Sequence, residues 1–537
     1  DAGTGTTSVG VIGNSTEIGA VTIGSANNGA ITLNGAITTD GAITIDGPVT
    51  LGADITVTTA DDAITFNHKI DGTQSLTLES GTGAITLDGV IGGDSILTGL
   101  SVNATDGDES NTGTIEITDI GDSAAVGVNT GTISIGNANT SSLTLDGTTY
   151  KTDGVTIYEA AAGNTILLTG ASPTITTMND NLTFDGGNIV LSTAGTTTID
   201  TELGGSGGGN VLIDGAIDGT DSQNEALVIN GGSGSVTVNG AIGATNPLTT
   251  ITIGSAGAGT IEVTNIGAGS AGATLATAIG NTSTGTLTLD GTVYNTGGTQ
   301  TYTAATGGGN IDITGAATFT TSADNIAFNT SGVDLSANVA ITTTTAGAGN
   351  VSFGGAIDTD SAGDRTLTID SGSGSVTFSG AIGLTNALGG LNVNATAGDG
   401  AGVITFSDIG DTGAGVTGVT AVGNSSTAQI VFAEDTYTFD TGATTFTATS
   451  GDNFDLTKGA TTTFTTVGTD ITFTTGAIAL ANGSNLVIDT GSGNGDITLG
   501  EIAGTSVETV TLDAGTGTTS VGVIGNSTEI GAVTIGS

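Results

Sequence analysis

The chain has 537 residues but no cysteine and no tryptophan, and only one methionine, one histidine and three prolines. Without cysteine it can hold no disulfide, no thiolate zinc site and no iron–sulfur cluster. Its glycines and prolines together make up about 18% of the residues, below the roughly 25–30% that is typical of a disordered Pro/Gly chain. The sequence therefore predicts a folded protein without covalent cross-links.

Basic residues are almost absent, because four Lys and Arg stand against 52 Asp and Glu and the net charge is -48. Proteins bind DNA, RNA and anionic lipid through clustered Lys and Arg, so we expect no nucleic-acid partner. No apolar run reaches the roughly 18 to 20 residues of a membrane span, so we expect no membrane insertion in this segment. Hydrophobic residues reach 36% but aromatic residues only 3%, which predicts a narrow core of Val, Ile, Leu and Ala.

Residues suited to catalysis are also scarce. His68 is the single histidine, which leaves no multi-histidine metal site and little basis for a Ser-His-Asp triad. Arg365 is the single arginine and lies in a turn-like segment. Aspartates are scattered at corners without a distinct pair for glycoside hydrolysis. We therefore expect that the protein is not an enzyme.

The clearest local pattern is a short alternation of aliphatic residues with threonine. Residues 29–52 read GAITLNGAITTDGAITIDGPVTLG, with Ile31, Ile37, Ile43 and Val49 six residues apart. Asp-Gly and Asn-Gly pairs lie between such segments and tolerate the positive φ of sharp corners. The pattern predicts strands of four or five residues without helices. It recurs at 63–66, 75–80, 84–88, 114–120 and 142–147.

Short alternating strands with glycine-rich corners predict an all-β fold, a parallel β-helix or β-solenoid. At roughly 20 residues a coil and about 4.8 Å between coils, the chain would form about 27 coils and a rod of about 130 Å. A string of β-sandwich domains is the alternative. The lack of Pro-rich or polar linkers between the units argues against it.

Residues 1–25 recur without change at 513–537, which gives a period of 512 residues. Inside the period, four drifted units start near 89, 240, 380 and 500 with GVIGGDS, GAIGATN, GAIGLTN and GEIAGTS. A Gly-Asn pair marks each unit a second time, at 13, 136, 280 and 423. We expect residues 1–537 to be one continuous solenoid segment of a tandem array.

Three of the units carry a tyrosine at a matching place, namely Tyr150, Tyr294 and Tyr437. These side chains are candidates either for contact points on one face of a fibre or for packing residues where the coil widens.

A rod of this length with this charge would be a strong polyanion, with one net charge per roughly 2.7 Å. Carboxylates stacked at the corners are candidate Ca²⁺ ligands, since this cation prefers hard oxygen donors. The segments nearest to a calcium loop are 491–496 and 207–214. Ordinary turn chemistry explains the same Gly and Asp residues.

Residues 227–243, LVINGGSGSVTVNGAIG, and 367–383, LTIDSGSGSVTFSGAIG, resemble the giant β-strand-repeat surface exoproteins of bacteria, which include filamentous-haemagglutinin-like adhesins and fibres. The resemblance is one of rhythm and composition over essentially the whole chain. It implies a right-handed β-helix, secretion to the cell surface and a role as a stalk, adhesin or fibre, and it carries over no catalytic or binding residue. The six-residue spacing at 29–52 leaves a left-handed helix open locally.

The sequence thus predicts a structural protein that forms an elongated extracellular or cell-surface filament. Its expected partners are copies of itself, joined end to end or bundled side by side. The alternative is the stalk of a bacterial surface adhesin or a surface-layer protein, with recognition outside this segment.

Overall fold

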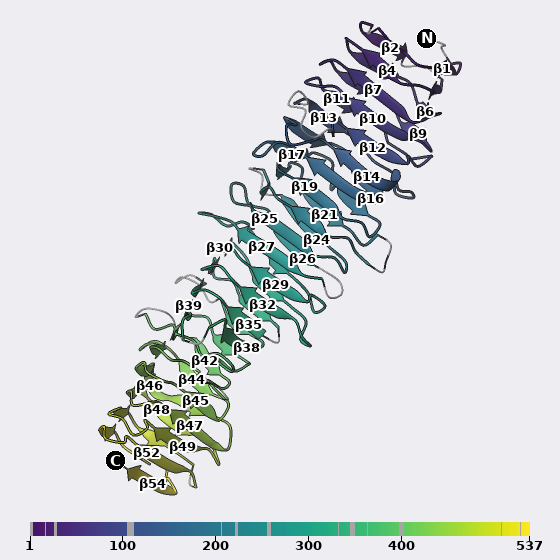
Figure 1. The fold of residues 1–537 in the computed structure, drawn as a ribbon. Helices are drawn as coiled ribbons and strands as arrows, with labels where there is room; N and C mark the ends of the chain where they lie inside the picture. The colour runs from purple at the N-terminus through teal and green to yellow at the C-terminus, as the bar shows by residue number, and fades with distance from the viewer. Residues whose placement is uncertain are drawn as a thin grey trace. The chain divides into compact units, whose positions relative to one another are not determined.

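A computed structural model describes residues 4–16, 18–25, 29–104, 112–203, 205, 207–220, 224–254, 259–330, 332–343, 349–361, 363–396, 402–411, 413, 415–505, 507–526 and 528–536. These residues form no helix, and their strands pair in parallel as a β-solenoid of about 20 turns in all. The predicted all-β parallel β-helix is confirmed. The chain divides into two compact units, unit 1 (Asp1–Thr274) and unit 2 (Leu275–Ser537), and coils stack within each (Figure 1).

The hexapeptides of residues 29–52 show how a coil of unit 1 is made. Strands β3 (Ile31–Leu33), β4 (Ile37–Thr39) and β5 (Ile43–Asp46) pair with β6 (Val49–Leu51), β7 (Ile55–Thr59) and β8 (Ile64–Phe66), respectively. Three successive strands therefore form the sides of one coil, and the fourth begins the next coil. The aliphatic residues point inward and are buried, while the threonines between them lie on the outer face.

Coil length varies far more than the predicted value of roughly 20 residues. Ile31 pairs with Val49, 18 residues later, whereas Val102 pairs with Ile135, 33 residues later. Because the strands are short and keep their register, the additional residues fall at the corners. The prediction of about 27 coils is therefore wrong, and the chain makes about 20.

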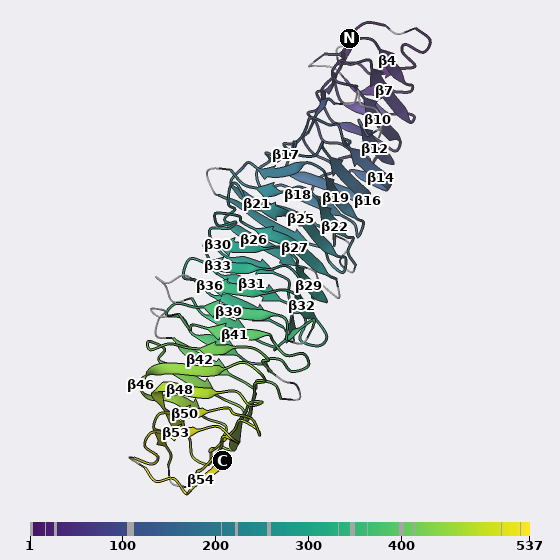
Figure 2. The ribbon, with the colours of Figure 1, turned by 60° about the vertical axis from the view of Figure 1, so that its left-hand side comes forward.

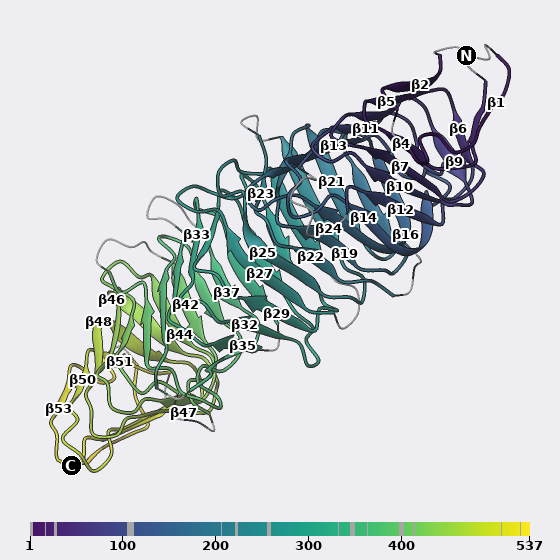
Figure 3. The ribbon, with the colours of Figure 1, turned by 45° about the horizontal axis from the view of Figure 1, so that its top comes forward.

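Inward side chains of unit 1 form columns that are largely aliphatic. One column runs through β8, β11 (Ile85–Leu87), β13 (Thr114–Ile117) and β15 (Ser142–Leu145). Its side chains Phe66, Leu87, Ile117 and Leu145 are all 0% exposed. Strands of this stack follow one another in Figure 3, where β11 and β13 are labelled.

The corresponding column in unit 2 is aromatic. It consists of Phe353, Phe378, Phe406 and Phe432, whose successive ring centroids are 5.5, 5.0 and 6.2 Å apart with interplanar angles of 7°, 4° and 19°. These rings come from β37 (Val351–Phe353), β40 (Val376–Phe378), β42 (Val403–Phe406) and β44 (Gln429–Phe432). All 13 Phe and five Tyr of the chain are buried. The predicted core of Val, Ile, Leu and Ala is therefore incomplete, because the aromatic rings are buried in it as well and stack one coil apart.

Candidate functional site

Three of the sequence markers, at 89, 240 and 380, form a corner of the coil. An aspartate of the preceding coil binds each of these corners. In each case one Oδ1 accepts hydrogen bonds from two consecutive backbone N–H groups of the marker, at 2.7 to 3.2 Å. The aspartates are Asp71, Asp218 and Asp358. Each follows an isoleucine and lies about 20 residues before its marker, a signal that the sequence analysis missed. The carboxylates thus serve as backbone acceptors.

The second glycine of each of these markers can only be glycine. Gly92, Gly243 and Gly383 have φ of 71°, 67° and 65°, a region that side-chain-bearing residues rarely adopt. A Cβ atom at these positions would lie 1.9 to 2.1 Å from a carbonyl oxygen of a glycine in the next coil. Glycine is therefore required in the marker because two backbones approach closely at this position.

The Gly-Asn marker is a turn that a threonine closes. Where the sequence reads GN-x-x-T, the backbone N–H of the asparagine donates to the Oγ1 of the threonine at 2.9 Å. The asparagines are Asn137, Asn281 and Asn424. Asn424 also donates from Nδ2 to the carbonyl oxygen of Asn394, which in turn bonds Ser371. These side chains are buried, so the marker builds an internal polar column at a corner.

The three marked tyrosines lie in the core. Tyr150, Tyr294 and Tyr437 are 0% exposed, and each hydroxyl accepts a hydrogen bond from the N–H three residues earlier, at 2.7 to 3.2 Å. The Tyr150 hydroxyl also donates to the carbonyl oxygen of Ile117 at 2.9 Å. Burial raises the pKa of all three hydroxyls. Each tyrosine thus packs against its own corner and joins it to the core.

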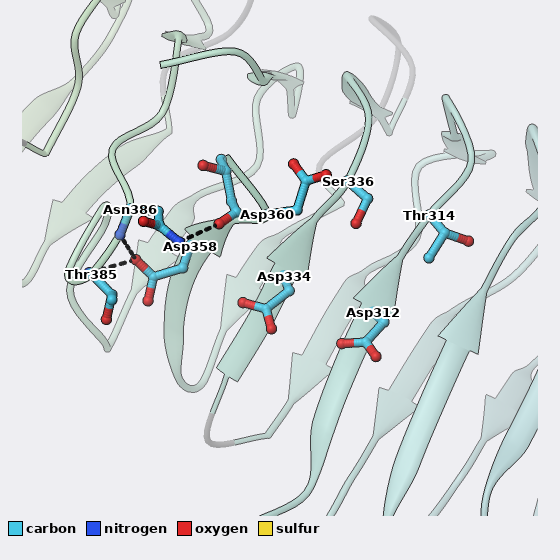
Figure 4. Close-up of a pocket in the computed structure, with 9 residues that line it drawn as sticks. Asp312, Thr314, Asp334, Ser336, Asp358, Asp360, Thr385 and Asn386 are labelled. Atoms are coloured by element: carbon cyan, nitrogen blue, oxygen red, sulfur yellow. Dashed lines mark hydrogen bonds between the residues drawn. The ribbon is translucent and has the colours of Figure 1, made fainter. Parts of the chain in front are cut away.

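An acidic groove of about 470 Å³ lies on the outer face of unit 2. Strands β32 (Asn310–Ile313), β35 (Gly332–Leu335) and β38 (Ala356–Thr359) place Asp312, Asp334 and Asp358 in register, one above another (Figure 4). The alternation of NIDI, GVDL and AIDT turns the aliphatic residues inward and the aspartates outward.

Like charges in this row repel one another, and the nearest amide partly offsets the repulsion. The Asn310 Nδ2 donates to Asp312 and, at 2.6 Å, to Asp334. Burial raises the pKa of Asp312, the Asn310 hydrogen bond opposes that rise, and the charge of Asp334 adds to it. Chemically, the groove concentrates negative potential and attracts cations.

The carboxylates that were candidate calcium ligands accept hydrogen bonds at the corners. In segment 491–496, Asp496 accepts from the N–H of Thr518 at 2.7 Å, and its own N–H donates to Asp470. In segment 207–214, Asp214 accepts from the amide of Asn239 at 2.6 Å. Among the residues that the structure describes, no group of three or more His, Cys, Asp or Glu is placed to hold a metal ion.

The two residues considered for catalysis make local contacts. The His68 Nε2 lies 3.3 Å from Asp46 Oδ1, and Arg365 Nε lies 3.0 Å from Asp360 Oδ1. They belong to different units, and neither lines the acidic groove.

No family model, no curated protein and no solved structure matches the chain. No helix suited to crossing a membrane occurs in the described part of the chain.

Proposed function

We propose that this chain is a structural protein that builds an elongated filament from tandem β-solenoid repeats, outside the cell or on its surface. It would act without catalysis, and its partners would be copies of the same repeat. The resemblance to bacterial surface exoproteins and the parallel solenoid support this proposal.

One observation carries the proposal, namely the behaviour of the sequence that occurs twice. At the first position it forms β1 (Thr7–Val9) and β2 (Val21–Gly24), which pair with the coil that follows. At the second position the same residues form β53 (Thr519–Val521) and part of β54 (Ala532–Gly536), which pair with the coil that precedes. The two positions together thus show how each edge of one coil pairs with its neighbouring coil.

The inward columns match across this repeated coil. Ile12 and its counterpart Ile524 are the same residue of the repeat, and they pair with Ile37 on the following side and Ile502 on the preceding side. Likewise, Ile23 pairs with Ile45, and its counterpart Ile535 pairs with Leu512. An aliphatic residue therefore meets an aliphatic residue on both edges, as a continuous array of 512-residue periods requires.

The proposal is tested by imaging chains of one and two periods by negative-stain electron microscopy. Each added period would lengthen the particle by about 100 Å, from about 20 turns at about 4.8 Å each. Particles that fold back or grow in width instead of length would contradict the proposal. Short stalks that end in a distinct domain, or planar lattices, in secreted material would favour the alternative of an adhesin stalk or a surface-layer protein.

A further inference from the structure

Asparagine-glycine pairs recur in the chain and differ in how firmly the fold holds them. The described part of the chain contains five such pairs, with the asparagine at 34, 230, 239, 482 and 494. We propose that Asn494-Gly495 is a site of spontaneous modification, at which the asparagine becomes aspartate or isoaspartate. The proposal goes beyond the filament and does not rest on it, because it concerns the chemistry of one corner.

The reaction is an attack of the backbone on the side chain that precedes it. The Gly495 nitrogen loses its proton to solvent and bonds to Asn494 Cγ, and Nδ2 leaves as ammonia after taking up a proton. One water molecule then opens the cyclic imide that results. Opening at Cγ gives aspartate in the ordinary main chain, and opening at the main-chain carbonyl gives isoaspartate, in which the main chain runs through Cγ. Glycine favours the attack because it has no Cβ to hinder its nitrogen.

The Asn494 corner leaves both reacting groups free of hydrogen bonds. Asn494 is exposed, and among the described residues neither its side-chain amide nor the Gly495 N–H has a hydrogen-bond partner. The contacts on either side leave these two groups alone. Thr490 Oγ1 donates to the Gly495 carbonyl oxygen at 2.9 Å, and the Asp496 N–H donates to Asp470 at 2.9 Å. No hydrogen bond therefore has to break before the nitrogen reaches Cγ.

Three other pairs hold the asparagine amide in place. Asn34 Nδ2 donates to Ser8 Oγ at 3.0 Å, and Asn239 Nδ2 donates to Asp214 at 2.6 Å. Asn230 Nδ2 donates to an aspartate at 3.2 Å, and the N–H that follows this asparagine donates to a carbonyl oxygen of the next coil at 3.1 Å. Asn34 and Asn239 are exposed as Asn494 is, so exposure alone does not separate the pairs.

The remaining pair is intermediate. Asn482 is exposed and its side chain has no hydrogen-bond partner among the described residues, but the Gly483 N–H donates to the buried Glu508 carboxylate at 3.2 Å. The attacking nitrogen must give up this bond first. We therefore rank Asn482 below Asn494 and above the three held asparagines.

The two products change the corner in different ways. Both add one negative charge beside Asp496. The aspartate product gives an Asp-Gly corner, which the chain already uses elsewhere, for example at Asp146-Gly147. The isoaspartate product adds one carbon to the main chain just ahead of β50 (Ile497–Leu499), where the chain rejoins the stack.

The proposal is tested by ageing the full chain at neutral pH. The chain is digested with pepsin, and the peptides are analysed by mass spectrometry with fragmentation that distinguishes aspartate from isoaspartate. We expect conversion at Asn494 to be about ten-fold faster than at Asn34, Asn230 and Asn239, because each hydrogen bond that must break first slows the reaction several-fold. Conversion should be faster at higher pH, because the attacking nitrogen must lose its proton.

Unfolded chain in concentrated urea is the control for the fold, and there the pairs should react at similar rates. Asn494→Gln is the matched variant, because its longer side chain would have to close a larger ring, and it should leave this corner unmodified while conversion at Asn482 is unchanged. Equal rates at all pairs in the folded chain would overturn the proposal. So would a folded chain in which Asn494 stays intact while it converts in urea. Neither result bears on the filament, whose test is particle length.

Discussion

The same position of the repeat holds an aliphatic side chain in unit 1 and a phenyl ring in unit 2. Leu87 lies two residues before the marker at 89, and Phe378 lies two residues before the marker at 380. Both are buried in short parallel strands, where Leu87 lies between Phe66 and Ile117 and Phe378 lies between Phe353 and Phe406. Ile117 and Phe406 each lie two residues before a corner aspartate, Asp119 and Asp408. Leu145 and Phe432 each lie five residues before a marked tyrosine, Tyr150 and Tyr437.

The difference shows that the corners specify the fold and the core follows them. Marker glycines, holding aspartates and Gly-Asn turns keep the same geometry in both units, while core residues change from branched chains to rings. In unit 2 the change extends along a column of successive rings, whereas in unit 1 the single ring of Phe66 lies between Ile45 and Leu87. A ring stacks well on another ring one coil away, which adds to the stability that burial alone gives.

The largest effect should come from removing one ring of the aromatic column. Phe378→Ala should lower the free energy of unfolding by about 4 kcal/mol, because it opens a cavity and breaks two stacked pairs. Leu87→Ala is the matched variant and should cost about 3 kcal/mol. Urea unfolding followed by circular dichroism measures both, and hydrogen exchange shows whether the loss stays within its unit. An equal or greater loss for Leu87→Ala would remove the distinction between the two columns.

The marker glycine should respond equally in the two units. Gly383→Ala and Gly92→Ala both introduce a Cβ at positive φ against a backbone carbonyl, and each should cost about 1 to 3 kcal/mol. The measurement is the same urea titration. If one variant were tolerated and the other were not, the corners would differ between units, and the view that they specify the fold would be wrong.

Two matched tyrosines should show effects of different size. Tyr302 donates from its hydroxyl to Gln300 Oε1 at 3.0 Å in unit 2, and Tyr302→Phe should cost about 1 kcal/mol by leaving that buried oxygen short of a donor. Tyr158 occupies the same place in unit 1, and its hydroxyl has no hydrogen-bond partner among the described residues. Tyr158→Phe should therefore be neutral or slightly stabilising. Thermal unfolding compares them, and a larger loss for Tyr158→Phe would contradict the assignment.

The smallest effect concerns the outward carboxylates, which should not distinguish the units. Burial raises the pKa of Asp312 in unit 2 and of Glu116 in unit 1. A raised pKa in the folded state means that the ionised form opposes folding, and that this cost disappears once the pH falls below the ordinary carboxyl value of about 4. Asp312→Asn and Glu116→Gln should each stabilise by about 0.5 kcal/mol or less at pH 7 and by nothing near pH 3.

Thermal melts at both pH values test this expectation. A gain that persisted at pH 3 would point to packing instead of charge.

The strands were predictable because their pattern is local. The expected strands at 63–66, 75–80 and 84–88 correspond to β8, β10 (Ser75–Glu79) and β11, within one residue at most ends. Coil length was not predictable, since it depends on how many residues each corner holds, and corner composition does not show where the chain rejoins the stack. The long strand β16 (Thr149–Glu159), which pairs with both β18 (Thr174–Thr177) and β19 (Leu182–Asp185), is one result.

The residues of the corners and the core also divide into features that the sequence predicts and features that it does not. The recurrence of the glycine at Gly92 and of the tyrosine at Tyr150 was visible in the sequence. The structural role of each residue was not, because both roles depend on contacts across a corner. The aspartates that hold the markers belong to the preceding coil, so only the three-dimensional stack joins Asp358 to Thr385. The aromatic column was hidden because 25 to 28 residues separate its successive rings.

The aspartates at the corners have a consequence for how such a chain can grow. Because Asp71, Asp218 and Asp358 accept from the backbone of the next coil, each brings a negative charge together with the hydrogen bond that the corner needs. Each repeat that is added by duplication therefore arrives already charged. A chain lengthened this way would gain negative charge in proportion to its size, and the repulsion between chains would grow with it.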